Sequence, residues 1–326
     1  MSDPLMDVEG LEVEFRTEDG VVKAVHGLSY GLRKGEILAV LGESGSGKTV
    51  HARAILRILD SPPAFVTGGE VSLDGTELFP LDEDEMVDIR GARIAMLFQD
   101  PHTALDPVYT VGGQMIELLR LRQGLSKREA KAEAIDLLKR VGIPSAEERL
   151  KAYPHQLSGG IAQRVMVAMA VALDPDVLLA DEPTSSLDVT VQAQVLELLK
   201  SLVADSEMSM VLITHNLAVA VAMADRIAVM YAGQLVEIGP AREVYAKPAH
   251  PYTAALLRSI PDINVREERL PAIKGAPPNL LHLPAGCPFN PRCEYATEIC
   301  LREMPPLESV GGEHASACWH WEEVVR

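Results

Sequence analysis

Eight consecutive residues fit the pattern G-x-x-x-x-G-K-[ST], which is typical of a loop that binds nucleotide phosphates. They are Gly42, Glu43, Ser44, Gly45, Ser46, Gly47, Lys48 and Thr49. In such a loop the backbone N–H groups and the positive end of the following helix face anionic oxygens. We expect Lys48 to reach the β- and γ-phosphates and the hydroxyl of Thr49 to bind an accompanying Mg²⁺. The loop therefore predicts a phosphate ligand with its magnesium ion.

Polar side chains also follow three apolar runs that are typical of buried strands. Asp181 and Glu182 follow one run, and two adjacent acids there are costly unless each faces a cation or a reacting group. Asp181 suits the magnesium shell, and Glu182 is then placed to position or deprotonate an attacking water. Gln99 and His215 follow the other two runs. We expect all four at one sheet edge, because α/β proteins place ligands outside the carboxyl ends of their strands.

A second predicted anion-binding helix start lies at Ser158, Gly159 and Gly160. Ser158 is expected to cap the helix, and the two glycines leave its first N–H groups open. A Ser-Gly-Gly cap is by itself a common turn. Its significance comes from the phosphate loop in the same chain, which gives the chain two predicted anion-binding helix starts.

All four cysteines lie close together near the end of the chain: Cys287, Cys293, Cys300 and Cys318. The first residues, Met1 to Pro4, have neither the basic start nor the apolar centre of a signal peptide, so we expect the chain to be cytosolic or attached to a membrane by a partner. Cytosolic thiols are kept reduced, and the clustering therefore favours a metal site over disulfides.

The elements expected around these residues define an α/β fold. The apolar run 37–41 predicts a buried parallel strand, and helical spacing follows the phosphate loop. Residues 8–40 predict an antiparallel β layer, and residues from about 100 to 172 predict an inserted helical subdomain. We therefore predict a phosphate-loop (RecA-like) domain over residues 1–260. Residues 261–326, rich in Pro, Cys and charge, predict a small irregular cysteine-containing appendage.

Phe15 has two interpretations. It is an apolar aromatic residue in the predicted β layer, upstream of the phosphate loop, where an adenine base can stack on it. It also fits an ordinary core position of a strand. The sequence leaves both interpretations open.

The whole chain limits the functional classes. It has 326 residues, 47% hydrophobic, which is ample for a packed core. Its formal net charge of −17 argues against an electrostatic nucleic-acid binder, because such proteins concentrate Lys and Arg. No apolar run approaches ~18 residues, so we expect the chain not to cross a bilayer by itself.

Taken in order, the motifs closely resemble those of an ABC-transporter ATP-binding subunit over about residues 8–240. The run Leu157-Ser158-Gly159-Gly160 discriminates best, because other phosphate-loop enzymes lack it. Ile161 stands where many members have Gln, which leaves the expected roles of Ser158 and Gly160 unchanged. The segment His250 to Thr253 and the Pro-rich tail around Cys287 and Cys293 resemble dipeptide/oligopeptide importer ATPases. Nickel importers of the same group share much of this region.

The resemblance implies roles for the site residues. Gln99 would sense the γ-phosphate and Mg²⁺, Glu182 would be the general base, and His215 would contact the γ-phosphate. It implies that ATP is held between two such subunits, so that Ser158, Gly159 and Gly160 cover the ATP of the other subunit. Asp188 would link the two sites.

The resemblance also implies partners and a location. The expected partners are a second ATPase subunit, related but distinct, two transmembrane permease subunits, and an extracytoplasmic solute-binding protein. Nucleic acid is not among them. The expected location is the cytoplasmic side of the inner cell membrane.

The resemblance also bears on the cysteines. The tail resembles one that holds an iron–sulfur cluster in some peptide-importer ATPases, so we expect one [4Fe–4S] cluster on the four thiolates. Zinc is the alternative metal for this site. The remaining alternative is that the four cysteines are simple reduced thiols without a metal. The imidazoles of His282, His314 and His320 lie nearby in the sequence as substitute ligands.

The sequence argues against two other functional classes. A soluble ABC-type ATPase acting on DNA or ribosomes would carry a long coiled-coil insertion or a second cassette, and this chain has neither. A non-hydrolysing regulatory module would be expected to lack Glu182 or His215, and both are present.

Overall fold

The computed structural model describes residues 4–259 and 273–325 of the chain. These residues fall into two compact units. The first unit comprises the described parts of residues 1–81 and 212–326, and the second unit comprises residues 82–211. The predicted domain boundary after residue 260 lies in the undescribed residues and stays a prediction.

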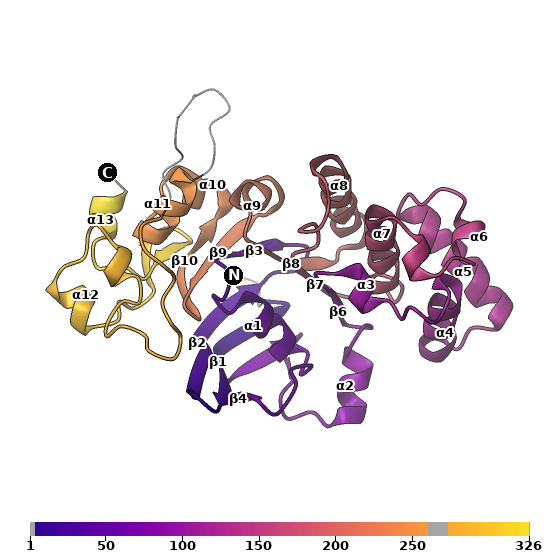
Figure 1. The fold of residues 1–326 in the computed structure, drawn as a ribbon, viewed down its shortest axis with the longest axis horizontal. Helices are drawn as coiled ribbons and strands as arrows, with labels where there is room; N and C mark the ends of the chain where they lie inside the picture. The colour runs from indigo at the N-terminus through magenta and orange to yellow at the C-terminus, as the bar shows by residue number, and fades with distance from the viewer. Residues whose placement is uncertain (1–3, 260–272, 326) are drawn as a thin grey trace. The chain divides into compact units, whose positions relative to one another are not determined.

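The antiparallel layer predicted near the N-terminus belongs to the first unit. Its strand order is β2-β1-β4-β5, with β1 at Met6–Thr17, β2 at Gly20–Leu32, β4 at Ala64–Leu73 and β5 at Thr76–Glu77 (Figure 1). In β1 the residues Met6, Val8, Leu11 and Val13 are completely buried. Their near-alternation with more exposed residues is the period of a strand with one face on a core.

A second group of strands in the first unit has the order β11-β12-β10-β9-β3. β3 (Ile37–Leu41) is parallel to β9 (Arg226–Tyr231), and β9 is antiparallel to β10 (Gln234–Pro240). All five residues of β3 are buried, as expected for a strand covered on both faces. The helices of this unit outside the tail are α1 (Lys48–Ile55), α9 (Leu217–Met223), α10 (Ala241–Ala246) and α11 (Pro251–Arg258).

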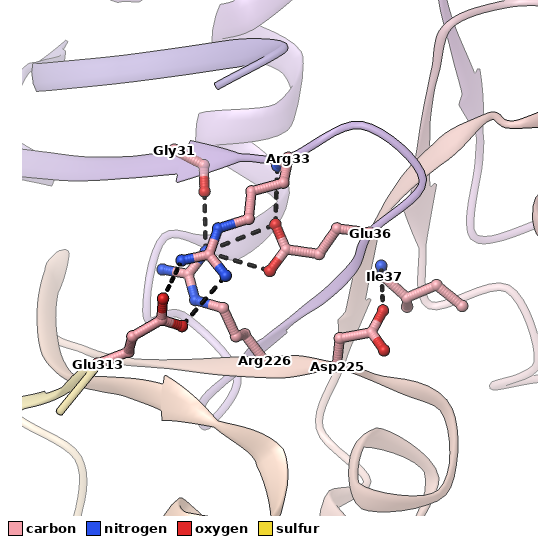
Figure 2. Close-up of polar contacts among 7 residues, drawn as sticks. All are labelled: Gly31, Arg33, Glu36, Ile37, Asp225, Arg226 and Glu313. Carbon is pink, nitrogen blue, oxygen red and sulfur yellow. Dashed lines mark hydrogen bonds and ion pairs between the residues drawn. The ribbon is translucent and has the colours of Figure 1, made fainter. Parts of the chain in front are cut away.

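Charged side chains fix the entry into β3. Arg226 donates to Glu36 Oε1 at 3.1 Å and to the carbonyl of Gly31 at 3.1 Å, and the Glu36 side chain is only 5% exposed (Figure 2). Asp225 accepts a hydrogen bond from the N–H of Ile37 at 2.9 Å. Breaking one member of a buried pair leaves an uncompensated charge, so this junction holds β3 in register with β9.

The second unit is mostly helical. It contains the parallel strands β6 (Ile94–Leu97) and β7 (Val177–Asp181), and β8 (Ser209–Thr214) crosses the boundary between the units. The helices α4, α5, α6 and α7 of the predicted helical subdomain lie together (Figure 1). The helical elements are α2 (Glu83–Ile89), α3 (Pro101–Ala104), α4 (Val111–Gln123), α5 (Lys127–Arg140), α6 (Ala146–Arg149), η1 (Pro154–Gln156), α7 (Gly159–Ala170) and α8 (Val189–Ser206).

The tail is more regular than the sequence indicates. It contains η2 (Asn290–Arg292), α12 (Glu298–Arg302), β11 (Glu308–Gly311), β12 (His314–Ser316) and α13 (Trp321–Val324). β12 pairs with β10, and Phe289 and Cys300 pack with Tyr231 and Tyr252 in one hydrophobic cluster. The tail therefore shares a hydrophobic core with β9 and α11 of the first unit. Among the described residues, no helix has the length and hydropathy that crossing a membrane requires.

Candidate nucleotide-binding site

The phosphate loop connects β3 to α1, as predicted. Gly47 precedes α1 with a φ of 98°, and a Cβ on Gly47 would lie 2.3 Å from the carbonyl oxygen of Ala24. A Cβ on Gly42 would lie 2.3 Å from the carbonyl oxygen of Met230. Both positions therefore require glycine, because any side chain would meet backbone. At the tip of the loop Ser44 and Gly45 are exposed.

Lys48 lies inside the loop and is only 5% exposed. Its Nζ donates to the carbonyl oxygens of Gly42 and Glu43, each at 2.8 Å, and to Ser46 Oγ at 3.3 Å. Thr49, the next residue in α1, is half-buried. The ammonium group is thus surrounded by loop oxygens, the kind of ligand that a phosphate would also offer.

In the second unit, the ends of β6 and β7 carry the predicted polar residues. These strands are parallel, and Leu97 pairs with Ala180. Gln99 Nε2 donates to Glu182 Oε2 at 3.1 Å, so the structure brings these two predicted residues together. Asp181 is the last residue of β7 and is 1% exposed.

Glu182 has a left-handed backbone, with φ at 45°. A non-glycine residue in this conformation costs roughly 1–3 kcal/mol, and such strain is concentrated at functional sites. The turn that follows β7 therefore fixes the direction of the Glu182 side chain at an energetic cost.

The helix start at Ser158 agrees only partly with the prediction. Ser158 is the N-cap residue of α7, but its side chain makes no capping hydrogen bond. A Cβ on Gly160 would lie 2.6 Å from Val191 Cγ1, whereas a Cβ on Gly159 would have 3.7 Å to Leu187. Gly160 thus lets α7 pack closely on α8, a reason for glycine that the sequence did not indicate.

Three further residues predicted for the site differ in their exposure and contacts: Asp188, His215 and Phe15. Asp188 caps α8, and its Oδ1 accepts from the N–H groups of Thr190 and Val191 at 3.1 and 3.0 Å. His215 follows β8 and is exposed. Phe15 is half-buried in β1, so it is not one of the fully buried core residues.

The predicted residues are shared between the units. The phosphate loop, Phe15 and His215 belong to the first unit. The second unit carries Gln99, Ser158, Gly159, Gly160, Asp181, Glu182 and Asp188.

Three residues near the phosphate loop were not predicted to have a role: Glu43, Tyr252 and Arg292. The N–H of Glu43 donates to Tyr252 Oη at 2.8 Å, and Arg292 makes a two-pronged ion pair with the Glu43 carboxylate. The signal for this contact was a charged residue inside a glycine-rich loop, without a nearby partner in the sequence.

The four cysteines are free thiols, and all of them line one small cavity: Cys287, Cys293, Cys300 and Cys318. Burial raises the pKa of Cys287 to about 11 and that of Cys318 to about 12. Of the substitute ligands, His320 Nε2 lies 2.7 Å from Thr297 Oγ1 and also lines this cavity. Within residues 4–259 and 273–325, no group of three or more His, Cys, Asp or Glu is arranged to hold a metal ion, so the predicted cluster is not supported by the structure.

Comparison with known proteins decides the family. Residues 25–185 match the family described as ABC transporter, and residues 236–300 match the oligopeptide/dipeptide transporter C-terminal region. The chain is 46% identical to the oligopeptide transport ATP-binding protein OppD of Bacillus subtilis, over 97% of this chain and 88% of that protein. This chain belongs to the peptide-importer group of ABC transporter ATP-binding proteins.

Further matches agree with this membership. The dipeptide transport ATP-binding protein DppD of Haemophilus influenzae is 47% identical over 94% of this chain and 93% of that protein. Among solved structures, the dimeric ATP-binding cassette MJ0796 bound to ADP and phosphate has a TM-score of 0.65 and 28% identity. That match covers 73% of this chain and 99% of the cassette. The predicted family and the predicted α/β cassette fold are therefore confirmed.

Proposed function

We propose that this chain is the ATPase subunit of an ABC importer and that ATP hydrolysis drives uptake of di- or oligopeptides. The observation that carries the proposal is the Glu182 carboxylate, held by Gln99 at the end of β7 in a chain with peptide-transport relatives. Uptake of nickel by the same architecture is the second candidate, based on the resemblance of the tail.

Glu182 acts as the general base. Its carboxylate accepts the proton of a water molecule as the water oxygen attacks the γ-phosphorus of ATP, and the bond from that phosphorus to ADP breaks. Gln99 restrains the carboxylate through its amide and contacts the γ-phosphate. His215 is a further γ-phosphate contact, and Lys48 neutralises charge on the β- and γ-phosphates.

Oxygen donors suit the proposed magnesium ion. The hydroxyl of Thr49, the carboxylate of Asp181 and the amide oxygen of Gln99 are hard ligands of the kind that Mg²⁺ prefers. When bound, the ion neutralises phosphate charge. Phe15, half-buried on β1, offers a ring face on which the adenine base stacks.

The working form is a head-to-tail dimer of ATPase subunits. The Ser158 side chain makes no capping hydrogen bond, which is consistent with a role toward an external anion. Ser158, Gly159 and Gly160 cover the ATP of the partner, and Asp188 connects the two sites. The partner is a related but distinct ATPase. The dimer lies on the cytoplasmic side of the inner membrane, against two permease subunits that receive substrate from a solute-binding protein.

The test is Glu182→Gln in the assembled transporter. The amide keeps the size and hydrogen-bonding capacity of the side chain but cannot accept the proton, so ATP turnover should fall by ~10² or more while ATP still binds. Phosphate release and binding of a fluorescent ATP analogue measure the two effects. Glu207→Gln is a matched control, because Glu207 also has a left-handed backbone, at φ 55°, and directly follows α8. Wild-type turnover by Glu182→Gln would contradict the role of the base.

The transported substrate is tested in cells. Deleting the gene should abolish uptake of a labelled dipeptide or oligopeptide, and the wild-type gene but not Glu182→Gln should restore it. Loss of nickel uptake with intact peptide uptake would favour the second candidate.

We also propose that the four cysteines hold a [4Fe–4S] cluster. Support comes from the resemblance of the tail and from the number of cysteines, since four thiolates are the number that such a cluster takes. The cluster would supply iron–thiolate bonds that join η2, α12 and the segment after β12. Protein purified without oxygen should be brown and contain about four irons per chain, and Cys318→Ser should lower that content. Colourless protein with one zinc per chain would replace the cluster by zinc, and metal-free protein would remove both.

A further inference from the structure

The second residue of the phosphate loop is held by residues near the other end of the chain. The N–H of Glu43 donates to Tyr252 Oη at 2.8 Å. Its carboxylate accepts from Arg292 Nη1 at 2.7 Å and from Nη2 at 3.0 Å. Its carbonyl oxygen accepts from Lys48 Nζ at 2.8 Å. Glu43 therefore connects the loop lysine to Arg292 and Tyr252.

Arg292 is built into this position. Its side chain is 5% exposed, and the Glu43 side chain is 24% exposed. Beyond the ion pair, Nε donates to the carbonyl oxygen of Lys274 at 2.9 Å, and Nη1 donates to Tyr231 Oη at 3.2 Å. The guanidinium also lies 5.8 Å from the ring centre of Phe289. A guanidinium fixed at so many points orients the carboxylate that it binds, because the two-pronged contact has a fixed geometry.

The backbone that carries Arg292 belongs to the cysteine segment. Arg292 ends η2 and precedes Cys293, whose N–H donates to the carbonyl oxygen of Asn290 at 3.3 Å. The N–H of Asn290 donates to the carbonyl oxygen of Cys287 at 3.0 Å, and the N–H of Cys287 donates to the carbonyl oxygen of Cys300 at 2.9 Å. The arrangement of the cysteine segment thus sets where the guanidinium lies.

A second ion pair between the tail and the rest of the first unit differs from the Arg292–Glu43 pair in its surroundings. Arg33 makes the same two-pronged contact with Glu313, at 3.1 and 2.8 Å, and it also joins the body of the first unit to the tail (Figure 2). Those side chains are 43% and 47% exposed, and within the described part of the chain their hydrogen bonds join them to each other and not to the phosphate loop. Of these two ion pairs, only Arg292–Glu43 includes the residue whose carbonyl oxygen binds Lys48.

We propose that Arg292 is a positioning residue for nucleotide binding: through Glu43 it sets the conformation of the phosphate loop and makes ATP affinity depend on the cysteine segment. The inference rests on the proposed function in one respect, that the loop binds ATP. Lys48 and the loop N–H groups contact phosphate in the bound and in the reacting nucleotide alike. Removing the contacts that restrain Glu43 should therefore weaken the binding of ATP and leave the rate of the chemical step unchanged.

The experiment measures binding of a fluorescent ATP analogue with Mg²⁺ to the full chain. Arg292→Ala should weaken binding about tenfold, a typical size for coupling between sites. In the assembled transporter KM for ATP should rise in proportion while kcat changes little. Arg292→Lys should restore only part of the affinity, because an ammonium group cannot bind both carboxylate oxygens in the same plane.

A double-mutant cycle tests the route through Glu43. Glu43→Gln should weaken binding by itself, and adding it to Arg292→Ala should have little further effect, because both changes break one interaction. Arg33→Ala is the control and should bind the analogue as the wild type does. If Arg292→Ala fails to fold, Arg292→Lys and Glu43→Gln still test the proposal.

The outcomes are distinguishable. If the wild-type chain binds no ATP, the proposed function fails. If the wild type binds ATP and Arg292→Ala, Arg292→Lys and Glu43→Gln bind it equally well, only the positioning role is overturned. A lower melting temperature and lower iron content with unchanged affinity would assign Arg292 to the structure of the tail alone and would also overturn the proposal. Equal weakening by Arg33→Ala would do the same.

Discussion

At the residue scale, His51 is the buried titratable side chain nearest in sequence to the phosphate loop. It lies in α1 with no exposed surface, and its ring is edge-on to Tyr30 with centres 5.9 Å apart. Burial, with a smaller contribution from the charge of Lys48, lowers the pKa of His51 to about 4. The folded protein therefore keeps this imidazole neutral.

This burial predicts acid sensitivity. Between the unfolded pKa near 6.5 and the folded value near 4, the unfolded chain binds more protons, so the free energy of unfolding falls as the pH falls. His51→Phe should make stability less dependent on pH in this window, although His250, whose pKa burial also lowers to about 3, acts in the same direction. Urea unfolding at several pH values measures the slope. His282→Phe, at an exposed position, is the control, and an unchanged slope in His51→Phe would contradict the prediction.

Some contacts between residues were predictable and some were not. Gln99 and Glu182 each follow an apolar strand pattern, and parallel strands bring such positions to one edge, so the sequence was sufficient for their proximity. The pairing of Arg292 with Glu43 joins positions 249 residues apart. No local pattern specifies such a partner, because either charge alone also fits an exposed surface.

At the element scale, the packing of α7 on α8 depends on the absence of a side chain at position 160. Gly160→Ala should destabilise the protein by about 1–3 kcal/mol, because the new methyl group would overlap the stiff side chain of Val191. Gly159→Ala, with 3.7 Å to its nearest neighbour, should have little effect on the melting temperature. Val191→Ala should relieve the cost in the double variant. Equal melting temperatures for Gly159→Ala and Gly160→Ala would contradict the close packing.

Elements with strong periodicity were predicted well, and short ones were missed. The helices α4 and α5 lie within the helical subdomain that was predicted over about residues 100–172, and Ser126 caps α5. α9 was missed because its sequence, LAVAVAM, has no polar face, although Asn216 before it accepts the N–H groups of Ala218 and Val219. β12 has three residues and forms through its pairing with β10, so its own sequence carries almost no signal.

At the scale of the whole molecule, a buried carboxylate joins the tail to the rest of the first unit. Glu237 in β10 has no exposed surface and accepts from the N–H groups of Ala249 and His250, at 2.7 and 3.0 Å, and from His314 Nε2 at 2.7 Å. His314 lies in β12, so one side chain connects β10, the entry to α11 and the tail.

Glu237→Gln should therefore destabilise the fold by about 3–5 kcal/mol, because the amide cannot accept all three hydrogen bonds and a buried donor loses its partner. Glu313→Gln breaks an exposed ion pair and should cost no more than about 1 kcal/mol. Chemical denaturation gives both values. A similar small loss for Glu237→Gln would show that the buried network contributes little.

The pairing of β12 with β10 also has a consequence for protein synthesis. β10 ends at Pro240, but its partner strand is β12, at His314–Ser316, far along the chain from β10. A nascent chain thus exposes an unpaired strand edge until residues 314–316 have been synthesised, and exposed edges promote aggregation. A stop codon between positions 240 and 314 would make that exposure permanent, so the truncated chain should aggregate or be degraded.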